Sequence, residues 1–316
     1  MSSSPNAGAT LAGKTTAAAP GAPSAHGLAL RGVDHTARPT WKLRETVAFY
    51  RDILGLPLIH VISARGWGPA THPDFLHFFF DSGNGSTIAF FYYLGSEPPE
   101  AMRDRPVMAP VPDDHVFDAT HTAWLVQGQD ELRAWKKKLE DAGLQVSVET
   151  THEVIESIYV RDPNGYFIEF TRKLRPLTQV DALDGHLTLR AALEAEDEAR
   201  TGQRRVSDIA EIWSRKARLV AEHVQPGQAQ ATPAVRIFVP RVREFAAIVE
   251  DARGRGDCRV QALGDYDRIE SDGPIEFRRK TLGLKPAIWY GLFTGGVQGR
   301  IETLDRDRVR IVPEAA

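Results

Sequence analysis

The sequence predicts an α+β fold built from two copies of one βαβββ unit, followed by a smaller α+β region. Two observations lead to this prediction. The same order of strand-like and helix-like segments occurs twice between residues 30 and 172, and the helices of the two copies end in similar runs, LGLPL at 54–58 and AGLQV at 142–146. The length of 316 residues also leaves room for more than one domain.

The first copy covers residues 30–95. It begins with a short strand-like segment at 30–37, and an approximately helical apolar face follows at 41–54 and stops at Gly55. Runs of aromatic and β-branched residues then predict three strands, at 57–63, 75–81 and 86–94. The run Gly83-Asn84-Gly85 predicts a hairpin turn between the last two strands.

The second copy covers residues 118–172 and follows a proline-rich connector at 95–117. The same reading gives the same order of elements, with a strand at 119–126, a helix at 130–142, and strands at 144–149, 154–161 and 166–171. The two copies therefore indicate a duplication of one βαβββ unit.

Three further regions flank the duplicated part. Residues 1–29 are rich in Ala, Ser, Thr, Pro and Gly and predict a disordered tail, because their apolar run is too short and too weak for a signal-peptide core. Residues 176–232 predict a helical connector with helices at 181–199 and 206–224. Residues 233–316 predict a small α+β domain of unidentified role, with a strand at 235–239, a helix at 242–251 and four more strands.

Composition narrows the classes of function. The 39 Lys plus Arg against 42 Asp plus Glu give a net charge of −3, which argues against nucleic acid or an anionic membrane surface as a partner. No apolar run approaches the roughly 20 residues needed to cross a bilayer. The single cysteine, Cys258, cannot form an intramolecular disulfide or a thiolate zinc cluster and fits a reducing cytoplasm.

Three candidate metal ligands stand out by the strands on which they fall in the two copies. His35 lies in the first strand of the first copy, His121 in the first strand of the second, and Glu169 in the last strand of the second. Two neutral imidazoles and one carboxylate suit a divalent metal and leave coordination positions free for substrate and oxygen. Each residue alone also has an ordinary explanation as a surface or hydrogen-bonded side chain.

Four motifs make the pattern more specific: VDHTA at 33–37, FYRDILGLPL at 49–58, THTAW at 120–124 and SIYVRDPNGYFIEF at 157–170. In this order they resemble the vicinal oxygen chelate superfamily, which contains glyoxalase I, bleomycin-resistance proteins, fosfomycin-resistance proteins and type I extradiol dioxygenases. The resemblance covers a little under half of the chain. It implies that the two units form a cupped open sheet around one metal held by His35, His121 and Glu169.

A fourth position separates branches of that superfamily. Glyoxalase I-like members carry a metal-binding glutamate where this sequence has Ala89, so the resemblance implies three protein ligands. This set is closest to the type I extradiol dioxygenases, in which a catechol-like aromatic substrate and O2 meet at Fe(II). Mn²⁺ and Zn²⁺ are the alternative metals.

Three further residues are candidates for catalysis. Tyr159 lies ten residues before Glu169, at the spacing of a substrate-binding tyrosine in extradiol enzymes, and His152 lies seven residues before Tyr159. His77, in the strand at 75–81, is the second candidate for proton transfer. The proton-transfer histidine of well-known extradiol enzymes would fall at Gly85 or Ser86, so the choice between His152 and His77 remains open.

The predicted function is therefore a metal-dependent, ring-cleaving dioxygenase that acts on a catechol-like aromatic. Alternating aromatic runs at 78–80 and 90–93 send half of their rings to the concave face, which suits an aromatic ligand. Two alternatives use the same fold: an oxygen-independent lyase or isomerase, and a non-catalytic protein that binds an aromatic compound. The exposed edge of an open sheet also favours a homodimer.

Overall fold

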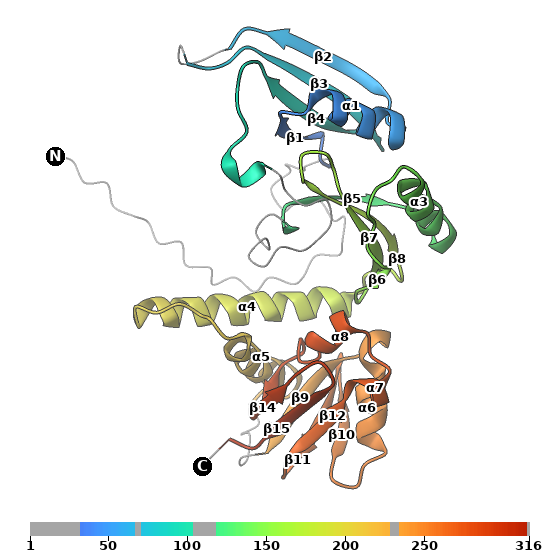
Figure 1. The fold of residues 1–316 in the computed structure, drawn as a ribbon. Coiled ribbons are helices and arrows are strands. Elements are labelled where there is room, and N and C mark those ends of the chain that lie inside the picture. The colour runs from blue at the N-terminus through green and yellow to red at the C-terminus, as the bar shows by residue number, and fades with distance from the viewer. Residues whose placement is uncertain (1–31, 67–70, 104–117, 228–233, 315–316) are drawn as a thin grey trace, which may run out of the picture. The chain divides into compact units, whose positions relative to one another are not determined.

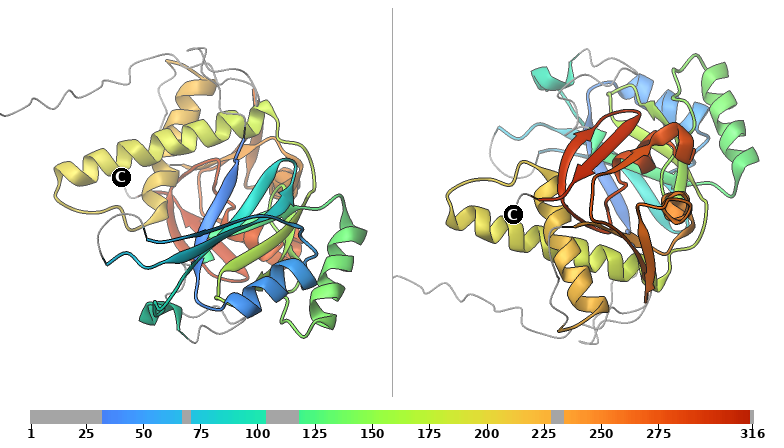
Figure 2. Two further views of the ribbon diagram at one scale, coloured as in Figure 1. Left: turned by 90° about the horizontal axis from the view of Figure 1, so that it is seen from above. Right: turned by 90° about the horizontal axis from the view of Figure 1, so that it is seen from below.

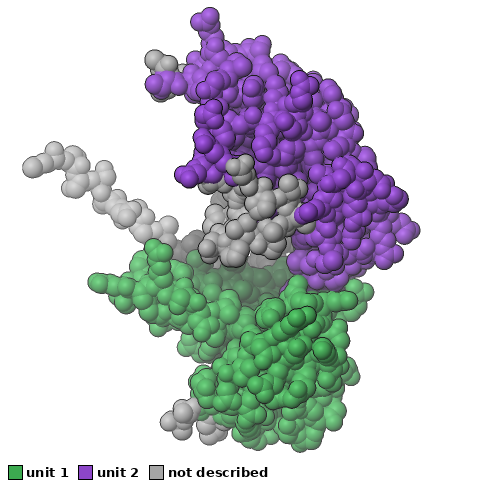
Figure 3. All heavy atoms as spheres, viewed as in Figure 1, with its two compact units in different colours: residues 1–29, 177–316 green, residues 30–176 purple. Residues whose placement is uncertain are grey.

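The computed structural model describes residues 32–66, 71–103, 118–227 and 234–314 (Figure 1). The chain divides into two compact units, one formed by Leu30–Pro176 and one that contains the residues from Leu177 onward (Figure 3). The predicted tail at 1–29 and most of the predicted connector at 95–117 lie outside the described residues. The first unit holds both copies of the repeated βαβββ motif, which we call module 1 and module 2.

Module 1 forms a four-stranded open sheet with strand order β1-β4-β3-β2. Its elements are β1 (His35–Thr40), α1 (Leu43–Val47), the π-helical turn η1 (Ala48–Ile53), β2 (Leu58–Ala64), β3 (Phe75–Gly83) and β4 (Ser86–Tyr93). Strand β1 runs parallel to β4, and the other neighbours are antiparallel. A short helix, η2 (Glu100–Met102), follows the sheet.

Module 2 repeats this arrangement with strand order β5-β8-β7-β6. Its elements are β5 (His121–Leu125), α3 (Gln129–Asp141), β6 (Thr150–Thr151), β7 (Ile155–Arg161) and β8 (Phe167–Lys173). Strand β5 is parallel to β8, as β1 is to β4. The predicted α+β fold of tandem βαβββ modules with open sheets is confirmed.

Local differences from the predicted elements have physical causes. The predicted helix at 41–54 is α1 followed by η1, whose end has a widened turn because the N–H of Leu54 bonds to the carbonyl of Phe49. The predicted strand at 144–149 is replaced by the two-residue β6, beginning at Thr150. Before β6, the hydroxyl of Ser147 accepts a hydrogen bond from the N–H of Tyr159 on β7. A side chain therefore takes the place of the backbone carbonyl that would accept this bond in a regular pair of strands.

The helical sides of the two modules share one hydrophobic core. Helices α1 and α3 lie next to each other in all views (Figures 1 and 2). Phe49 and Leu54 from module 1 belong to the same buried cluster as Leu132 and Leu139 from module 2, and the Lys138 ammonium donates to the carbonyl of Leu54. The sheet faces on the other side carry the candidate site residues.

A buried polar network joins the modules at the turn that links β7 to β8. The Asp162 carboxylate accepts hydrogen bonds from the N–H groups of Asn164 and Tyr166 and from the Tyr50 hydroxyl at 3.0 Å. The Asn164 side chain accepts from Thr40 at 2.7 Å and donates to Thr46 at 3.0 Å. Burial raises the pKa of Asp162. The turn thus fixes module 2 on the β1–α1 corner of module 1.

The second unit contains two sheets, with strand orders β10-β11-β9-β13 and β12-β15-β14. Its strands are β9 (Val235–Pro240), β10 (Arg259–Leu263), β11 (Tyr266–Ser271), β12 (Ile275–Arg278), β13 (Val297–Gln298), β14 (Arg300–Leu304) and β15 (Arg308–Val312). Its helices are α4 (Gln179–Thr201), α5 (Ile209–Val224), η3 (Arg243–Phe245), α6 (Ala246–Arg253), α7 (Arg279–Leu282) and α8 (Pro286–Tyr290). Six strands therefore follow β9, where the sequence predicts four.

Helices α4 and α5 are integral to this unit, which differs from the predicted helical connector at 176–232. Trp213 of α5 lies in the same buried cluster as the strands, and Ala217 belongs to a second buried cluster with Phe238 of β9 and Leu187 of α4. The periodicity of the segment predicts the helices but does not show that the sheet buries their apolar sides. No helix among the described residues is long and apolar enough to cross a membrane.

One buried ion pair ties α4, α5 and the sheet region together. The fully buried Lys216 ammonium on α5 donates to the Asp184 carboxylate and the Thr188 hydroxyl on α4, each at 2.6 Å, and to the carbonyl of Thr294. The Tyr266 hydroxyl of β11 donates to the same Asp184 oxygen at 3.0 Å. Satisfied in this way, the buried charge is tolerated in the core.

Candidate metal centre

The register of module 2 places the predicted residues on one face of its sheet. Glu169 on β8 lies between Ala123 on β5 and Tyr159 on β7, and His121 pairs with Phe167, two residues before Glu169. Side chains two residues apart on a strand share a face. His121, Glu169 and Tyr159 therefore belong to the face opposite α3.

His121 and Glu169 form the closest pair of candidate ligands. The Nε2 atom of His121 lies 3.0 Å from Oε2 of Glu169, whose side chain is 5% exposed, while the imidazole is 34% exposed. The other ring nitrogen of His121 lies 2.9 Å from the carbonyl oxygen of Asp118. A carbonyl only accepts, so Nδ1 carries the hydrogen and a neutral imidazole has its lone pair on Nε2.

This assignment makes the contact informative. A lone pair on Nε2 and a carboxylate oxygen at 3.0 Å repel each other unless a proton or a cation lies with them. Two donor atoms bound at about 2.1 Å to one metal, at roughly a right angle, lie about 3 Å apart. The pair therefore has the donor types and the separation of two adjacent metal ligands, and it is an ion pair when His121 carries a second proton.

A hydroxyl on the neighbouring strand β7 holds the second oxygen of Glu169. The fully buried Ser157 hydroxyl donates to Oε1 of Glu169, and it also lies 3.0 Å from the Thr171 hydroxyl. A carboxylate oriented by such a partner keeps its free oxygen aimed at a ligand position. Sequence reasoning missed Ser157. Its signal was available, because it lies two residues before Tyr159 on the same strand face.

Tyr159 and His152 form a second polar pair beside the first. The Tyr159 hydroxyl lies 2.8 Å from Nε2 of His152 and 3.5 Å from Oε1 of Glu169, and its ring stacks on Phe167 at 5.1 Å between centroids. Burial, and next the negative charge of Glu169, raise the pKa of Tyr159. Its phenol is therefore protonated at neutral pH and can donate a hydrogen bond.

His35 lies on module 1 and is not brought to the His121–Glu169 pair. Its Nδ1 lies 2.7 Å from the Asp34 carboxylate, and its ring meets the edge of Phe79 at 5.8 Å between centroids. With a partner at Nδ1, His35 shows no hydrogen bond at Nε2 among the described residues, whereas Nε2 of His121 faces Glu169. Within the described ranges, no group of three His, Cys, Asp or Glu side chains is placed to hold a metal ion. The three-ligand set remains a prediction.

His77 also lies on module 1, on the same sheet face as His35. Its side chain is 7% exposed and stacks on Phe91 at 3.6 Å between centroids, and its buried Nε2 has no hydrogen-bond partner among the described residues. Burial, and then the nearby imidazoles of His35 and His60, lower the pKa of His77. Sequence reasoning did not single out His60, which meets Phe79 on the adjacent strand.

The predicted site residues thus form two groups. Module 2 brings together His121, Glu169, Tyr159 and His152, which are two candidate ligands and a donor pair. Module 1 brings His35 and His77 to one aromatic face. The first group can bind a cation through an imidazole and a carboxylate and can move a proton between a phenol and an imidazole.

Comparison with known proteins agrees with the fold. Residues 32–170 match the sequence model of the Glyoxalase/Bleomycin resistance protein/Dioxygenase superfamily. No curated protein matches the chain.

Three bacterial proteins are among the solved structures that match this chain. A lactoylglutathione lyase from Agrobacterium tumefaciens is 20% identical, with 46% of this chain and 95% of that chain covered and a TM-score of 0.31. A glyoxalase/dioxygenase from Nostoc punctiforme is 18% identical, with 46% and 92% covered and a TM-score of 0.33. A fosfomycin resistance protein from Listeria monocytogenes is 18% identical, with 46% and 94% covered and a TM-score of 0.31.

The family match and the tandem βαβββ modules cover the same residues. The divalent metals that members of this superfamily bind are also consistent with the donor types on module 2. The part of the chain at 32–170 belongs to the Glyoxalase/Bleomycin resistance protein/Dioxygenase superfamily.

Proposed function

We propose that this protein is a metal-dependent dioxygenase that cleaves a catechol-like aromatic ring in the extradiol manner. The observation that carries the proposal is the His121–Glu169 pair, with 3.0 Å between Nε2 and Oε2 and the hydrogen of His121 fixed on Nδ1. A bound divalent metal, Fe(II) in this proposal and Mn²⁺ or Zn²⁺ as alternatives, would supply adjacent positions for the two catechol oxygens and for O2.

The neighbouring side chains fit the needs of such a substrate. A catechol must lose a proton as it binds, and the His152 imidazole can take it through the Tyr159 hydroxyl, 2.8 Å away. The phenol of Tyr159 stays protonated, so it can orient a substrate oxygen by donating a hydrogen bond. The flat face of Phe167, beside Tyr159, excludes water from one side of the catechol ring.

The third ligand, His35, comes from a second copy of the chain in this proposal. His35 is exposed on module 1, and the described part of the chain provides no hydrogen bond to its Nε2. A homodimer in which module 1 of one copy faces module 2 of the other completes the set of two histidines and one glutamate. The same contact brings His77, which shares the face of His35, to the substrate as a second proton-transfer candidate.

Metal binding and O2 consumption test the reaction. Protein loaded anaerobically with Fe(II) should consume O2 with a panel of catechols, including bulky biaryl ones, and form a coloured ring-opened product. Glu169→Gln should weaken metal binding by about 100-fold or more and abolish O2 uptake, because an anionic ligand is lost. Lys137→Gln on the outer face of α3, where the exposed Lys137 pairs with Asp141, is the matched control.

The outcomes separate the alternatives. No O2 uptake by protein with a full metal content would exclude the dioxygenase and favour oxygen-independent metal chemistry. Affinity for a catechol that is unchanged in His121→Ala would instead indicate a metal-independent binding protein.

Mixed dimers test the shared site. His35→Ala and Glu169→Gln each damage both sites of their own homodimer, but a mixed dimer of the two variants keeps one intact site. Co-refolding equal amounts should therefore restore about a quarter of the wild-type metal content, because half of the dimers are mixed and each has one good site of two. No recovery would mean that all three ligands come from one chain, and full metal content in the His35→Ala homodimer would mean that His35 is not a ligand.

A further inference from the structure

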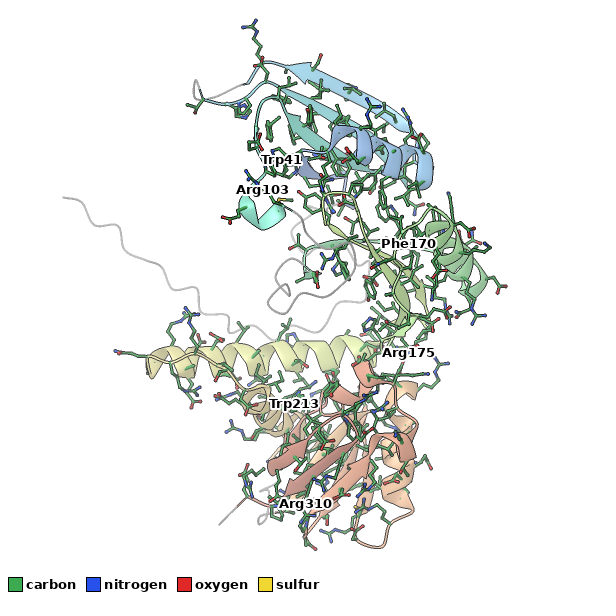
Figure 4. All side chains as sticks on the ribbon, viewed as in Figure 1. Trp41, Arg103, Phe170, Arg175, Trp213 and Arg310 are labelled. Carbon is green, nitrogen blue, oxygen red and sulfur yellow. The ribbon has the colours of Figure 1, made fainter. Side chains whose placement is uncertain are left out.

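A cavity of about 330 Å³ lies at the junction of the modules, and none of the candidate metal ligands lines it. Its walls come from the corner between β1 and α1, from the segment that follows β4, and from the turn between β7 and β8. Figure 4 shows Trp41 beside η2, close to Arg103. This volume falls in the range of small-molecule sites.

One wall is an indole with unused faces. The Nε1 of Trp41 donates to the Ser96 hydroxyl at 3.2 Å, which fixes the ring by its polar edge. Among the described residues, no other aromatic ring or cation stacks on Trp41. The thioether side chain of Met102 lies on the same cavity. A flat ring could therefore lie against the indole and contact a polarisable sulfur.

The charged residues of the cavity are unbalanced. Lys42 and Arg103 contribute two positive charges, and Glu97 contributes one negative charge. The Lys42 ammonium donates to the carbonyl of Pro163 at 2.9 Å, a neutral acceptor, and Arg103 lies 3.9 Å from Glu97, at the limit of an ion pair. Both cations can therefore bind an anion without breaking a strong ion pair.

Asn164, the remaining polar residue of the cavity, contributes little to hydrogen bonding with a ligand. Asn164 is buried, and its carbonyl oxygen accepts from Thr40 while its amide donates to Thr46 and Asp162. With the amide engaged in this network, polar recognition falls to the two cations at the rim. A ligand that fits has one flat apolar part and one negative charge.

We propose that this cavity binds an aromatic monocarboxylate, with its ring against Trp41 and its carboxylate between Lys42 and Arg103. The proposal is independent of the metal centre, because no candidate metal ligand lines the cavity. Since the walls come from both modules, an occupant contacts module 1 and the Asn164 turn of module 2 together. Binding therefore stabilises the junction between the modules.

Calorimetric titration of metal-free protein with benzoate tests the site. Benzoate should bind saturably and raise the midpoint of thermal unfolding. Benzamide, which lacks the charge, cyclohexanecarboxylate, which lacks the flat ring, and inorganic phosphate should each bind about tenfold more weakly or not at all. Using metal-free His121→Ala protein as well excludes carboxylate binding at the metal centre.

Variants locate the binding. Arg103→Gln and Lys42→Gln should each weaken benzoate binding by about fivefold, and Trp41→Leu by about tenfold. Lys137→Gln, which removes an exposed charge on α3, should leave the affinity unchanged. Arg103 is exposed, so its replacement keeps the fold and gives a result even if Trp41→Leu misfolds.

Three results would overturn the proposal. The first is no saturable binding of benzoate at millimolar concentration. The second is benzoate affinity that does not change in Arg103→Gln and Lys42→Gln. The third is phosphate binding as tight as benzoate, which would show a site for small anions with no use for the indole.

Discussion

Modules 1 and 2 have the same strand register and different chemistry. His35 and His121 hold equivalent positions, because their partner residues on β4 and β8 lie two residues before Ala89 and Glu169 respectively. The duplicated fold thus presents one histidine on each module but a carboxylate on module 2 alone. The difference shows that the fold places the histidines equivalently, and that the residue at the position of Ala89 and Glu169 decides which copy has a histidine–carboxylate pair.

The neighbouring strand differs in the same way. Phe79 occupies the position of Tyr159, and His77 occupies that of Ser157, as their partners on β4 and β8 show. Module 2 has hydroxyls around its carboxylate, whereas module 1 has rings around a buried imidazole. The face of module 2 thus presents oxygen donors, and the face of module 1 presents aromatic rings.

The hairpin turns provide the first test of this comparison. The Asp162 carboxylate accepts from the N–H of Asn164 at 2.9 Å, and the Asp81 carboxylate accepts from the N–H of Gly83 at 2.8 Å, two residues on in each case. Asp162→Ala should lower the free energy of unfolding by about 3 kcal/mol, because it leaves buried donors unpaired, Tyr50 among them. Asp81→Ala at the exposed turn should cost less than about 1 kcal/mol. Urea unfolding of both variants measures the difference.

The contribution of Asp162 to the stability of the folded protein changes with pH in a definite direction. Because burial raises the pKa of Asp162 in the folded protein, its contribution to stability is largest at acidic pH and declines as pH rises through that raised pKa. Asp162→Asn, which cannot titrate, should therefore gain stability relative to wild type as the pH rises above about 4, the ordinary pKa of Asp. Equal costs for Asp162→Ala and Asp81→Ala would refute the idea that only the module 2 turn bears on the junction.

The hydroxyl beneath the carboxylate provides a second, smaller effect. Ser157→Ala removes the donor to Oε1 of Glu169, so the carboxylate loses its orientation. Metal affinity should fall by about tenfold, the effect typical of a residue that orients a ligand. Competition with a chelator measures it. Ser63→Ala, at an exposed position on β2 of module 1, should have no effect, and an unchanged affinity in Ser157→Ala would mean that Glu169 needs no support.

The buried imidazole of module 1 provides the smallest effect, of opposite direction. His77→Phe should raise the free energy of unfolding by about 1 kcal/mol, because it removes a buried nitrogen without a partner and keeps a ring on Phe91. The lowered pKa of His77 means that wild-type stability declines as pH falls below about 6.5, where the unfolded imidazole takes up a proton. The gain in His77→Phe should therefore grow at acidic pH. The same change at the exposed His60 should alter stability much less, and a loss in His77→Phe would contradict an unsatisfied imidazole.

Sequence periodicity predicts the modules because each buries one regular face. It misses features that depend on single side chains, such as the Ser147 hydroxyl that replaces a ladder carbonyl before β6. It also cannot see that Tyr50 and Asp162, 112 residues apart, share a hydrogen bond, because periodicity carries no information about partners across the fold. In the second unit the same limit applies to α5, whose burial against the sheet does not follow from its sequence.

The candidate site follows the same division. The alternation of side chains along β7 and β8 correctly places Tyr159 beside Glu169, because the two strands are neighbours joined by a short turn. The tautomer of His121 depends on the carbonyl of Asp118, and His35 joins no group of three donor side chains among the described residues. Residue types predict which atoms can bind a metal, but only the three-dimensional arrangement shows which of them meet.

The Lys216 ion pair sets the smallest piece of the chain that can form the second unit. A fragment that begins after α4 would keep the Lys216 ammonium in its core and lose both the Asp184 carboxylate and the Thr188 hydroxyl. An uncompensated charge of this kind is among the most destabilising changes a core can suffer. The boundary for separate expression of this unit therefore lies ahead of α4, near Leu177, even though the sheets begin only at Val235.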